Sequence, residues 1–410
     1  TPDTDRPRAR SALTRLAIAE GVANGGSWQC HELSSEAQQA AAAYHAFLRR
    51  RQTTLIRVRP WSPVRMWASL QQTYQRMATF PMPCSRYLVD RHVPHLMLVD
   101  RDLTNAGLQD VEALIIPTAR IVSDEQLTAL RECTEAGLGI VLVGPCATHD
   151  EWGDVRQTSW ISQALAVESE WPDKPRRIDF GRGRVAYLPA PSLPEAANAG
   201  LSREAEAGLA GLEQALVHVS RRPLPAAVDT GANVEVSISY DGANTLLVHL
   251  VNYAVDLGGA VEGETALPVK VRLPKGKSVK RAVFVSPDED TPPHWLPFTI
   301  LTPGPARCVE VVIPGLEIYG QIEYELVDET PVWERLPLLH VSQERPAAPG
   351  GEVVLQLALS RRLAAGWRVE GPEGWTFRFE GMTAGETRCI AMVPADATRG
   401  RHPLDLAVGN

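Results

Sequence analysis

The pattern of apolar residues changes along the chain, and this change most constrains its fold. From about residue 62 to residue 143, short continuous apolar runs such as EALIIPT and GIVLVG alternate with helical segments. Strands that are apolar on both faces are typical of a parallel sheet covered by helices on both sides. Beyond about residue 225 the helical spacing disappears, and apolar residues recur at every second position. The sequence therefore predicts an α/β module followed by all-β modules.

The α/β module is predicted to be a doubly wound parallel sheet over residues 62–222. Ser123, followed by two acidic residues, is a typical N-cap for a helix that Gly137 ends. The segment WISQALAV, the strand RVAYLP and the helix EAEAGLAGLEQALVHV complete this module.

Two β modules are predicted after it. VEVSISYDGANTLLVHLVNY is typical of a hairpin with Asp241-Gly242 in its loop, and four further alternating segments extend it into a β-sandwich over residues 223–343. The linker ERPAAPGGE, rich in proline and glycine, then opens a second small sandwich over residues 344–410.

Residues 1–61 are predicted to be helical. Apolar groups at helical spacing over residues 9–23 are followed by Asn24-Gly25-Gly26, and a second helix, rich in alanine, covers about 34–51. Two helices make an incomplete core, and the sequence does not identify what they pack against.

Charge and cysteine usage exclude several classes of protein. The net charge of -8 and a pI near 5.8 argue against a nucleic-acid binder. No run of eighteen apolar residues is present, so no membrane span is predicted. The six cysteines lie far apart without a C-x-x-C pair, which favours a reducing, cytoplasmic location over a disulfide framework or a zinc module. Nucleotide-loop, zinc-protease and serine-hydrolase motifs are missing, and no cofactor is predicted.

The order of these parts resembles a known family. The run YLVDRHVPHLMLVDRDLTNAGLQDVEALIIPTARIVSDEQLTALRECTEAGLGIVLVG resembles the Rossmann-like domain that follows the catalytic (β/α)8 barrel of family 42 β-galactosidases. That domain is called the trimerisation domain, and its fold resembles class I glutamine amidotransferases. LLVHLVNY resembles a strand of the β domain that lies downstream in these enzymes, and residues 344–410 resemble an Ig-like module. AIAEGVANGGSW resembles the last strand and helix of the barrel. By this resemblance, the N-terminal segment is a barrel remnant.

The resemblance implies a function in which this chain is not itself the catalyst. A retaining glycosidase needs two carboxylates roughly 5 Å apart, on a barrel of roughly 250 residues, whereas only about sixty residues precede the α/β module. We therefore expect a fragment or a separately encoded C-terminal half, which serves subunit assembly and shapes a glycosidase active site. Its expected partners are carbohydrate, through an associated barrel, and either further copies of itself or a catalytic barrel chain.

Cys146 and His149 are the weak catalytic candidates, in the stretch GIVLVGPCATHDEWGD. In amidotransferase-like families a nucleophilic cysteine follows a strand in a tight elbow and is activated by a histidine from a later strand. Here Thr148 replaces the second glycine of the elbow, and His149 is only three residues from Cys146. A small buried cysteine is the alternative.

Other polar and aromatic groups give weaker indications. HDEWGD carries four residues that could bind a metal, but a polar loop in which Asp150 caps a turn is the alternative, and no metal site is predicted. By the resemblance, Trp28 and His31 lie near the sugar pocket, where an aromatic face stacks on a pyranose; Trp28 could instead cover the gap between two helices. Trp367 and Trp375 are either a carbohydrate platform or core residues of the last sandwich.

Two alternative functions remain at this stage. One is a stand-alone Cys-dependent hydrolase that uses Cys146. The other is a carbohydrate-binding or scaffolding protein without catalysis.

Overall fold

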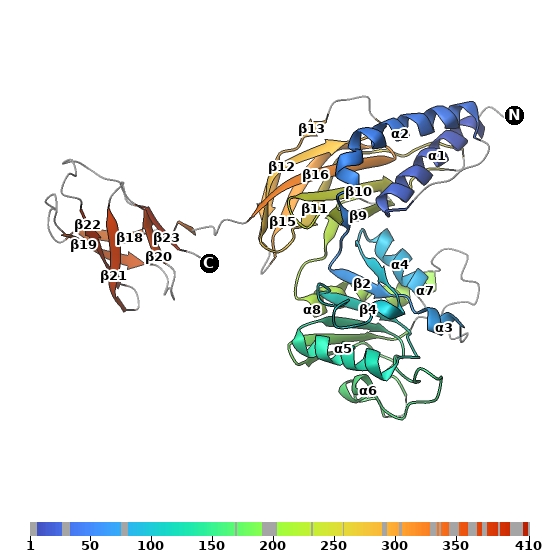
Figure 1. The fold of residues 1–410 in the computed structure, drawn as a ribbon, viewed down its shortest axis with the longest axis horizontal. Coiled ribbons are helices and arrows are strands. Elements are labelled where there is room, and N and C mark those ends of the chain that lie inside the picture. The colour runs from blue at the N-terminus through green and yellow to red at the C-terminus, as the bar shows by residue number, and fades with distance from the viewer. Residues whose placement is uncertain are drawn as a thin grey trace. The chain divides into compact units, whose positions relative to one another are not determined.

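The chain forms two compact units, residues Thr1–Val327 and Asp328–Asn410 (Figure 1). The structure is a computed structural model. It describes residues 6–26, 33–74, 81–168, 170–190, 203–230, 233–256, 258–288, 293–302, 306–328, 334–335, 338–343, 352–359, 367–370, 375–383, 386–393 and 405–408. The expected combination of an α/β module with β-rich modules is confirmed.

A six-stranded sheet forms the centre of the α/β module. In spatial order its strands are β3 (Leu96–Leu98), β2 (Val64–Trp67), β4 (Ala113–Pro117), β5 (Gly139–Val143), β7 (Gly183–Leu188) and β6 (Arg176–Phe180). The first five are parallel, and β6 pairs antiparallel with β7 at one edge. Counted along the chain, the parallel strands have the order 2-1-3-4-5, which is one of the two common doubly wound orders.

Helices cover both faces of this sheet, as the continuous apolar runs predict. The helices are α3 (Leu70–Tyr74), α4 (Pro81–Asp90), α5 (Asp124–Ala136), α6 (Trp160–Ala164), α7 (Arg203–Leu209) and α8 (Leu212–Ser220), with a short 3-10 turn, η1 (Asp100–Asp102). Residues of α5 and α6 share one core cluster, and residues of α4 and α8 share the other. Ser123 caps α5 as predicted, whereas the helix predicted over EAEAGLAGLEQALVHV is divided into α7 and α8.

The β-sandwich of the first unit consists of two antiparallel sheets that enclose one core. One sheet has the order β1 (Arg59–Pro60), β9 (Val234–Tyr240), β10 (Thr245–Asn252), β16 (Tyr319–Asp328), β12 (Lys277–Val285) and β13 (His294–Trp295). The other has the order β14 (Phe298–Leu301), β15 (Cys308–Leu316), β11 (Glu264–Arg272) and β8 (Ala226–Val228). The predicted hairpin is the pair β9 and β10, whose turn Asp241 stabilises by accepting hydrogen bonds from the N–H groups of Ala243 and Thr245.

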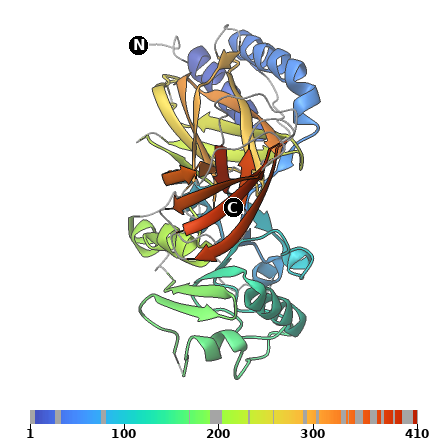
Figure 2. The same ribbon diagram turned by 90° about the vertical axis from the view of Figure 1, so that its left-hand side faces the viewer.

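The N-terminal helices α1 (Arg6–Ala23) and α2 (Ser35–Leu55) pack against the sandwich. Their buried side chains share a cluster with residues of the β1-β9-β10-β16-β12-β13 sheet, and both helices lie along that sheet in two views (Figures 1 and 2). Asp288 fixes the contact, because it accepts hydrogen bonds from Tyr44 (2.6 Å) and Arg15 (3.1 Å). The barrel-like strand expected within AIAEGVANGGSW does not occur in residues 17–26, since residues 17–23 belong to α1.

The second unit contains two small sheets. Their orders are β17 (Glu334–Arg335), β23 (Asp405–Val408), β20 (Trp367–Glu370), and β18 (Leu338–Gln343), β19 (Glu352–Leu359), β22 (Glu386–Met392), β21 (Thr376–Thr383). Because β18 pairs with β19, residues 338–343 belong to this unit and not to the preceding sandwich, so the unit begins before the expected position 344. Trp367 begins β20 and Trp375 precedes β21, which places the two tryptophans at different sheets.

Within the described part of the chain, no helix has the length and apolar character needed to cross a membrane.

Candidate functional site

The loop after β5 lies where ligands usually bind in a doubly wound sheet, at the carboxyl ends of the strands. Gly144 begins this loop with φ of +86°. A Cβ atom at Gly144 would lie 2.7 Å from Thr118 Oγ1 and 2.8 Å from Ala190 Cβ, so a larger residue would clash there. The glycine therefore lets the chain turn closely across the edge of the sheet.

Cys146 does not reach the surface of this edge. Its side chain is fully buried and belongs to the apolar cluster on the α5 and α6 face of the sheet, together with Trp67 and Ile161. Burial raises the pKa of its thiol to about 12. Because the thiolate is the reactive form, Cys146 is held in an unreactive state at neutral pH.

His149 connects two loops and is not hydrogen-bonded to Cys146. Its ring Nδ1 is hydrogen-bonded to Thr148 Oγ1 at 2.8 Å. Its backbone N–H donates to the carbonyl of Arg120, and its carbonyl accepts from the N–H of Val122. The two catalytic candidates thus lie three residues apart in the chain, but the structure does not join them as nucleophile and base. Trp28 and His31 lie outside the described residues.

The acidic residues around His149 form a turn. Asp150 Oδ1 accepts hydrogen bonds from the N–H groups of Trp152 (3.0 Å) and Asp154 (2.9 Å), which is the capping role weighed above for this residue. Among the described side chains, no three His, Cys, Asp or Glu residues gather in a way that could hold a metal ion.

The crevice at the switch point of the sheet, between β2 and β4, is filled by the chain itself. The side chain of Gln72 is fully buried, and its Oε1 accepts hydrogen bonds from the backbone N–H groups of Arg120 (3.0 Å) and Ile121 (3.1 Å). Its Nε2 donates to the Ile121 carbonyl at 2.5 Å. These backbone groups, which could otherwise contact a ligand, are therefore occupied by α3.

Asp100 holds α3 in this position. Its Oδ2 accepts hydrogen bonds from the N–H groups of Leu70 (3.0 Å) and Gln71 (3.2 Å), and its Oδ1 accepts from the indole of Trp67 (3.0 Å). Capping of this kind satisfies N–H groups at the start of a helix. The crevice between β2 and β4 is thus filled by segments far apart in sequence that these hydrogen bonds hold together.

Exposed apolar side chains lie on this edge. Trp152 is 82% exposed and Val155 is 77% exposed, and Leu70 is exposed as well. A hydrogen bond from Gln71 Nε2 to the Glu151 carbonyl, at 2.8 Å, holds their two segments together. We call Leu70, Trp152 and Val155 the carboxyl-edge surface. A large exposed aromatic side chain on a turn fixed by hydrogen bonds is typical of a contact point for another molecule.

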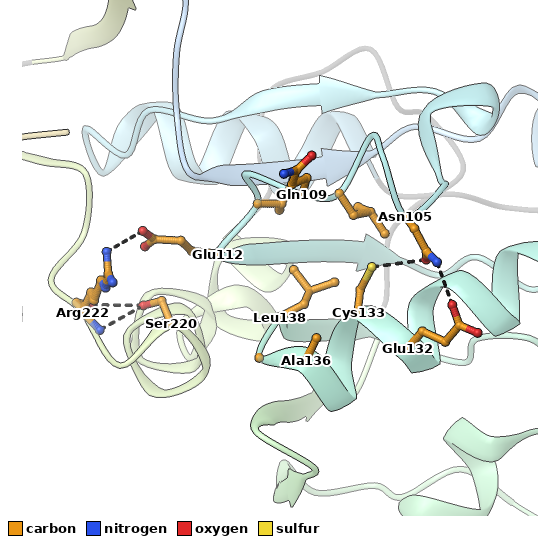
Figure 3. Close-up of a pocket in the computed structure, with 12 residues that line it drawn as sticks. Asn105, Gln109, Glu112, Glu132, Cys133, Ala136, Leu138, Ser220 and Arg222 are labelled. Carbon is orange, nitrogen blue, oxygen red and sulfur yellow. Dashed lines mark hydrogen bonds and ion pairs between the residues drawn. The ribbon is translucent and has the colours of Figure 1, made fainter. Parts of the chain in front are cut away.

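An open pocket lies at the opposite edge of the sheet, near the amino ends of β4 and β5 (Figure 3). Its volume is about 580 Å³, and it lies between the end of α5, the loop before β4 and the end of α8. Glu112 lies at one side and forms ion pairs with Arg222 (2.7 Å) and with the buried Arg272 of the sandwich (2.8 Å). The ion pair with Arg272 joins the α/β module to the sandwich.

The other side of this pocket is formed by Asn105, Glu132 and Cys133 (Figure 3). Asn105 Nδ2 donates a hydrogen bond to Glu132 Oε2 at 2.6 Å, and Cys133 Sγ donates to Asn105 Oδ1 at 3.5 Å. Cys133 is partly exposed, whereas Cys84, Cys146 and Cys308 are buried. Partial burial, with the nearby charge of Glu132, raises the pKa of the Cys133 thiol.

Sequence reasoning missed the residues that define both edges. Gln72 and Asp100 have no local pattern that indicates their long-range hydrogen bonds, and Glu112 is a single acidic residue before a strand. Trp152 had a recognisable signal, because a tryptophan in the polar stretch HDEWGD has no apolar neighbours in sequence to pack with.

Comparisons with known proteins give only structural likenesses. No protein-family model matches the sequence, and no curated protein matches it. A cold-adapted β-galactosidase from Rahnella sp. R3 is similar at 12% identity, over 76% of this chain and 51% of that chain, with a TM-score of 0.48. A catalytic mutant of a family 42 β-galactosidase from G. stearothermophilus is similar at 13% identity, over 72% and 44%, with a TM-score of 0.42.

A β-galactosidase from Bacillus circulans sp. alkalophilus is similar at 12% identity, over 72% of this chain and 46% of that chain, with a TM-score of 0.44. The chain spans about half the length of these three structures. The solved structures that it matches thus include a family 42 β-galactosidase, at low identity and over part of its length.

Proposed function

We propose that this chain is a non-catalytic part of a glycoside-hydrolase-like protein, which serves subunit assembly and shapes an active site carried by a barrel outside these residues. The glycosidase class follows from the sequence resemblance described above. The assembly role is supported by one observation, which is the state of the carboxyl edge of the parallel sheet. Gln72 fills the switch-point crevice at this edge, and the edge exposes apolar side chains.

The filled crevice favours assembly over catalysis. A catalytic site in a doubly wound sheet needs an open crevice with an accessible nucleophile or base. Here Gln72 fills the crevice, and the thiol of Cys146 is buried with a raised pKa. The pair of carboxylates that cleaves a glycosidic bond would then belong to the barrel.

The carboxyl-edge surface is suited to a protein partner. Hot spots of protein interfaces are often tryptophans, and binding loses less entropy when the segment that carries such a residue is already ordered. The turn at Asp150 orders this backbone, because its carboxylate accepts hydrogen bonds from the N–H groups of Trp152 and Asp154. We take the partner to be a second copy of this chain.

Sedimentation velocity over a range of protein concentrations tests this proposal. We expect the chain to self-associate, and Trp152→Ala to weaken the association on the order of 30-fold, as truncation of a hot-spot residue does. Trp295→Ala is the matched control, since Trp295 is also a largely exposed tryptophan, at 66%, but lies on β13 of the sandwich. A chain that stays monomeric, or an equal effect of both substitutions, would contradict the assembly role.

A hydrolysis assay tests the proposal that the catalytic groups lie outside these residues. The chain alone should not hydrolyse p-nitrophenyl β-galactoside. Hydrolysis by the purified chain that survives removal of contaminating enzymes would place the catalytic groups within these residues and overturn the non-catalytic role.

A further inference from the structure

We infer that the pocket at the amino edge of the parallel sheet is a binding site for a neutral, polyhydroxylated ligand, such as one or two units of a carbohydrate. The choice of ligand class rests on the proposed function. The site itself is distinct from the carboxyl-edge surface, because it lies where β4 and β5 begin and not where they end. Its contribution would be to hold carbohydrate next to the assembled enzyme.

The size and floor of the pocket suit such a ligand. Its volume of about 580 Å³ lies within the range of roughly 300–1,000 Å³ that is usual for small-molecule sites. Leu108, Val111 and Leu138 line it and are themselves buried, so they form a fixed apolar floor. A pyranose has apolar C–H groups on its ring faces, and these can lie on such a floor.

The charges of the pocket cancel locally and favour a neutral ligand. Glu112 is neutralised by Arg222 and by Arg272, at 2.7 and 2.8 Å. Glu132 is the remaining carboxylate, and one of its oxygens already accepts a hydrogen bond from Asn105. An anion would meet two carboxylates here, and a cation would meet the Arg222 guanidinium.

The polar groups at the rim can both donate and accept hydrogen bonds, as sugar hydroxyl groups require. Gln109 lines the pocket, and its amide makes no hydrogen bond to any other described residue. An amide offers two donors and one accepting oxygen, and a carboxylate offers only acceptors. Gln109 and Glu132 lie at different parts of the lining (Figure 3), so that a ligand with several hydroxyl groups can contact both.

Cys133 provides a reporter at the wall of the pocket (Figure 3). Its thiol is partly exposed, so N-ethylmaleimide should alkylate it in the folded chain. A ligand in the pocket covers the thiol. With ligand at about ten times its Kd, roughly one molecule in eleven is free at any moment, and alkylation at Cys133 should slow about tenfold.

The experiment measures this protection on the whole chain with lactose, cellobiose and maltose as probes, following the Cys133 peptide by mass spectrometry and binding by calorimetry. We expect at least one sugar to bind and to slow alkylation, and Gln109→Ala with Glu132→Gln to abolish both effects. Gln214→Ala, at an exposed position of α8 that does not line the pocket, is the control and should change neither. Circular dichroism verifies that each variant is folded.

Two outcomes would overturn the inference. One is that none of the three sugars gives heat or protection at millimolar concentration. The other is that a sugar binds but the Gln109→Ala, Glu132→Gln variant still binds it. Sedimentation of the same samples distinguishes the two proposals. Self-association without sugar binding contradicts only the proposed sugar site. Sugar binding without self-association contradicts only the assembly role.

Discussion

Glu112→Gln is expected to destabilise the first unit strongly, because it removes the partner of a buried charge. The side chain of Arg272 is only 4% exposed, and Glu112 Oε2 lies 2.8 Å from its guanidinium. Burial lowers the pKa of Arg272, and the Glu112 charge opposes this shift. After the substitution, Arg272 still donates a hydrogen bond to the Pro223 carbonyl at 3.1 Å.

The magnitude follows from the burial of the two partners. Removal of one partner of a buried ion pair costs roughly 3–5 kcal/mol. Glu112 is 29% exposed, so water can replace part of what it provides. We therefore expect the free energy of unfolding to fall by about 3 kcal/mol, at the lower end of that range. Arg222 loses its partner as well, but it is more exposed and adds little.

Urea unfolding followed by tryptophan fluorescence and circular dichroism measures this loss. Glu135→Gln is the control, because Glu135 pairs with Arg131 one helical turn earlier in α5 and both side chains are exposed. That pair should contribute about 0.5 kcal/mol or less. The double variant Glu112→Leu, Arg272→Met should lose less than Glu112→Gln, since it leaves no buried unpaired charge. If Glu112→Gln is as mild as Glu135→Gln, the Glu112–Arg272 ion pair does not hold the two modules together.

Two further predictions concern buried titratable groups. Burial and then the charge of Arg51 lower the pKa of His249 to about 4. Between roughly pH 4 and 6.5 the unfolded chain binds a proton at His249 and the folded chain does not. The free energy of unfolding therefore falls by roughly 3 kcal/mol as pH falls from roughly 6.5 to 4. If urea unfolding of a His249→Gln variant shows the same dependence on pH as the parent chain, this prediction is wrong. Cys146 should resist iodoacetamide in the folded chain while Cys133 reacts, and peptide mass spectrometry that finds Cys146 alkylated first would revive the thiol-hydrolase hypothesis.

Local signals in the sequence predicted the elements well. Ser123 with Gln126 forms the two reciprocal hydrogen bonds of a capping box, and Gly137 ends that helix with φ of +127°. The Asp241 turn likewise depends on residues within four positions of one another. Such features are predictable because the interacting groups are neighbours in the chain.

Contacts between distant segments were not predictable in this way. The position of helices α1 and α2 depends on Asp288, which is 273 residues from Arg15, so no local pattern indicates it. The second unit was expected to start at residue 344, because the proline-rich linker is a strong local signal in the sequence. The pairing of β18 with β19, which assigns residues 338–343 to this unit, has no such local signal. Residues 344–351 of that linker lie outside the described part.

Gln72 explains why the candidate site could not be found from the loop that carries Cys146. The strand order creates a crevice at the edge of any such sheet, and the sequence correctly predicted the strands that form it. Whether the crevice is open depends on one amide, whose oxygen satisfies the N–H groups of Arg120 and Ile121, 48 and 49 residues away. Because buried backbone groups must be paired, a ligand could enter only by displacing Gln72 and replacing all three of its hydrogen bonds. The crevice is therefore filled by hydrogen bonds of the chain itself, whatever residue occupies position 146.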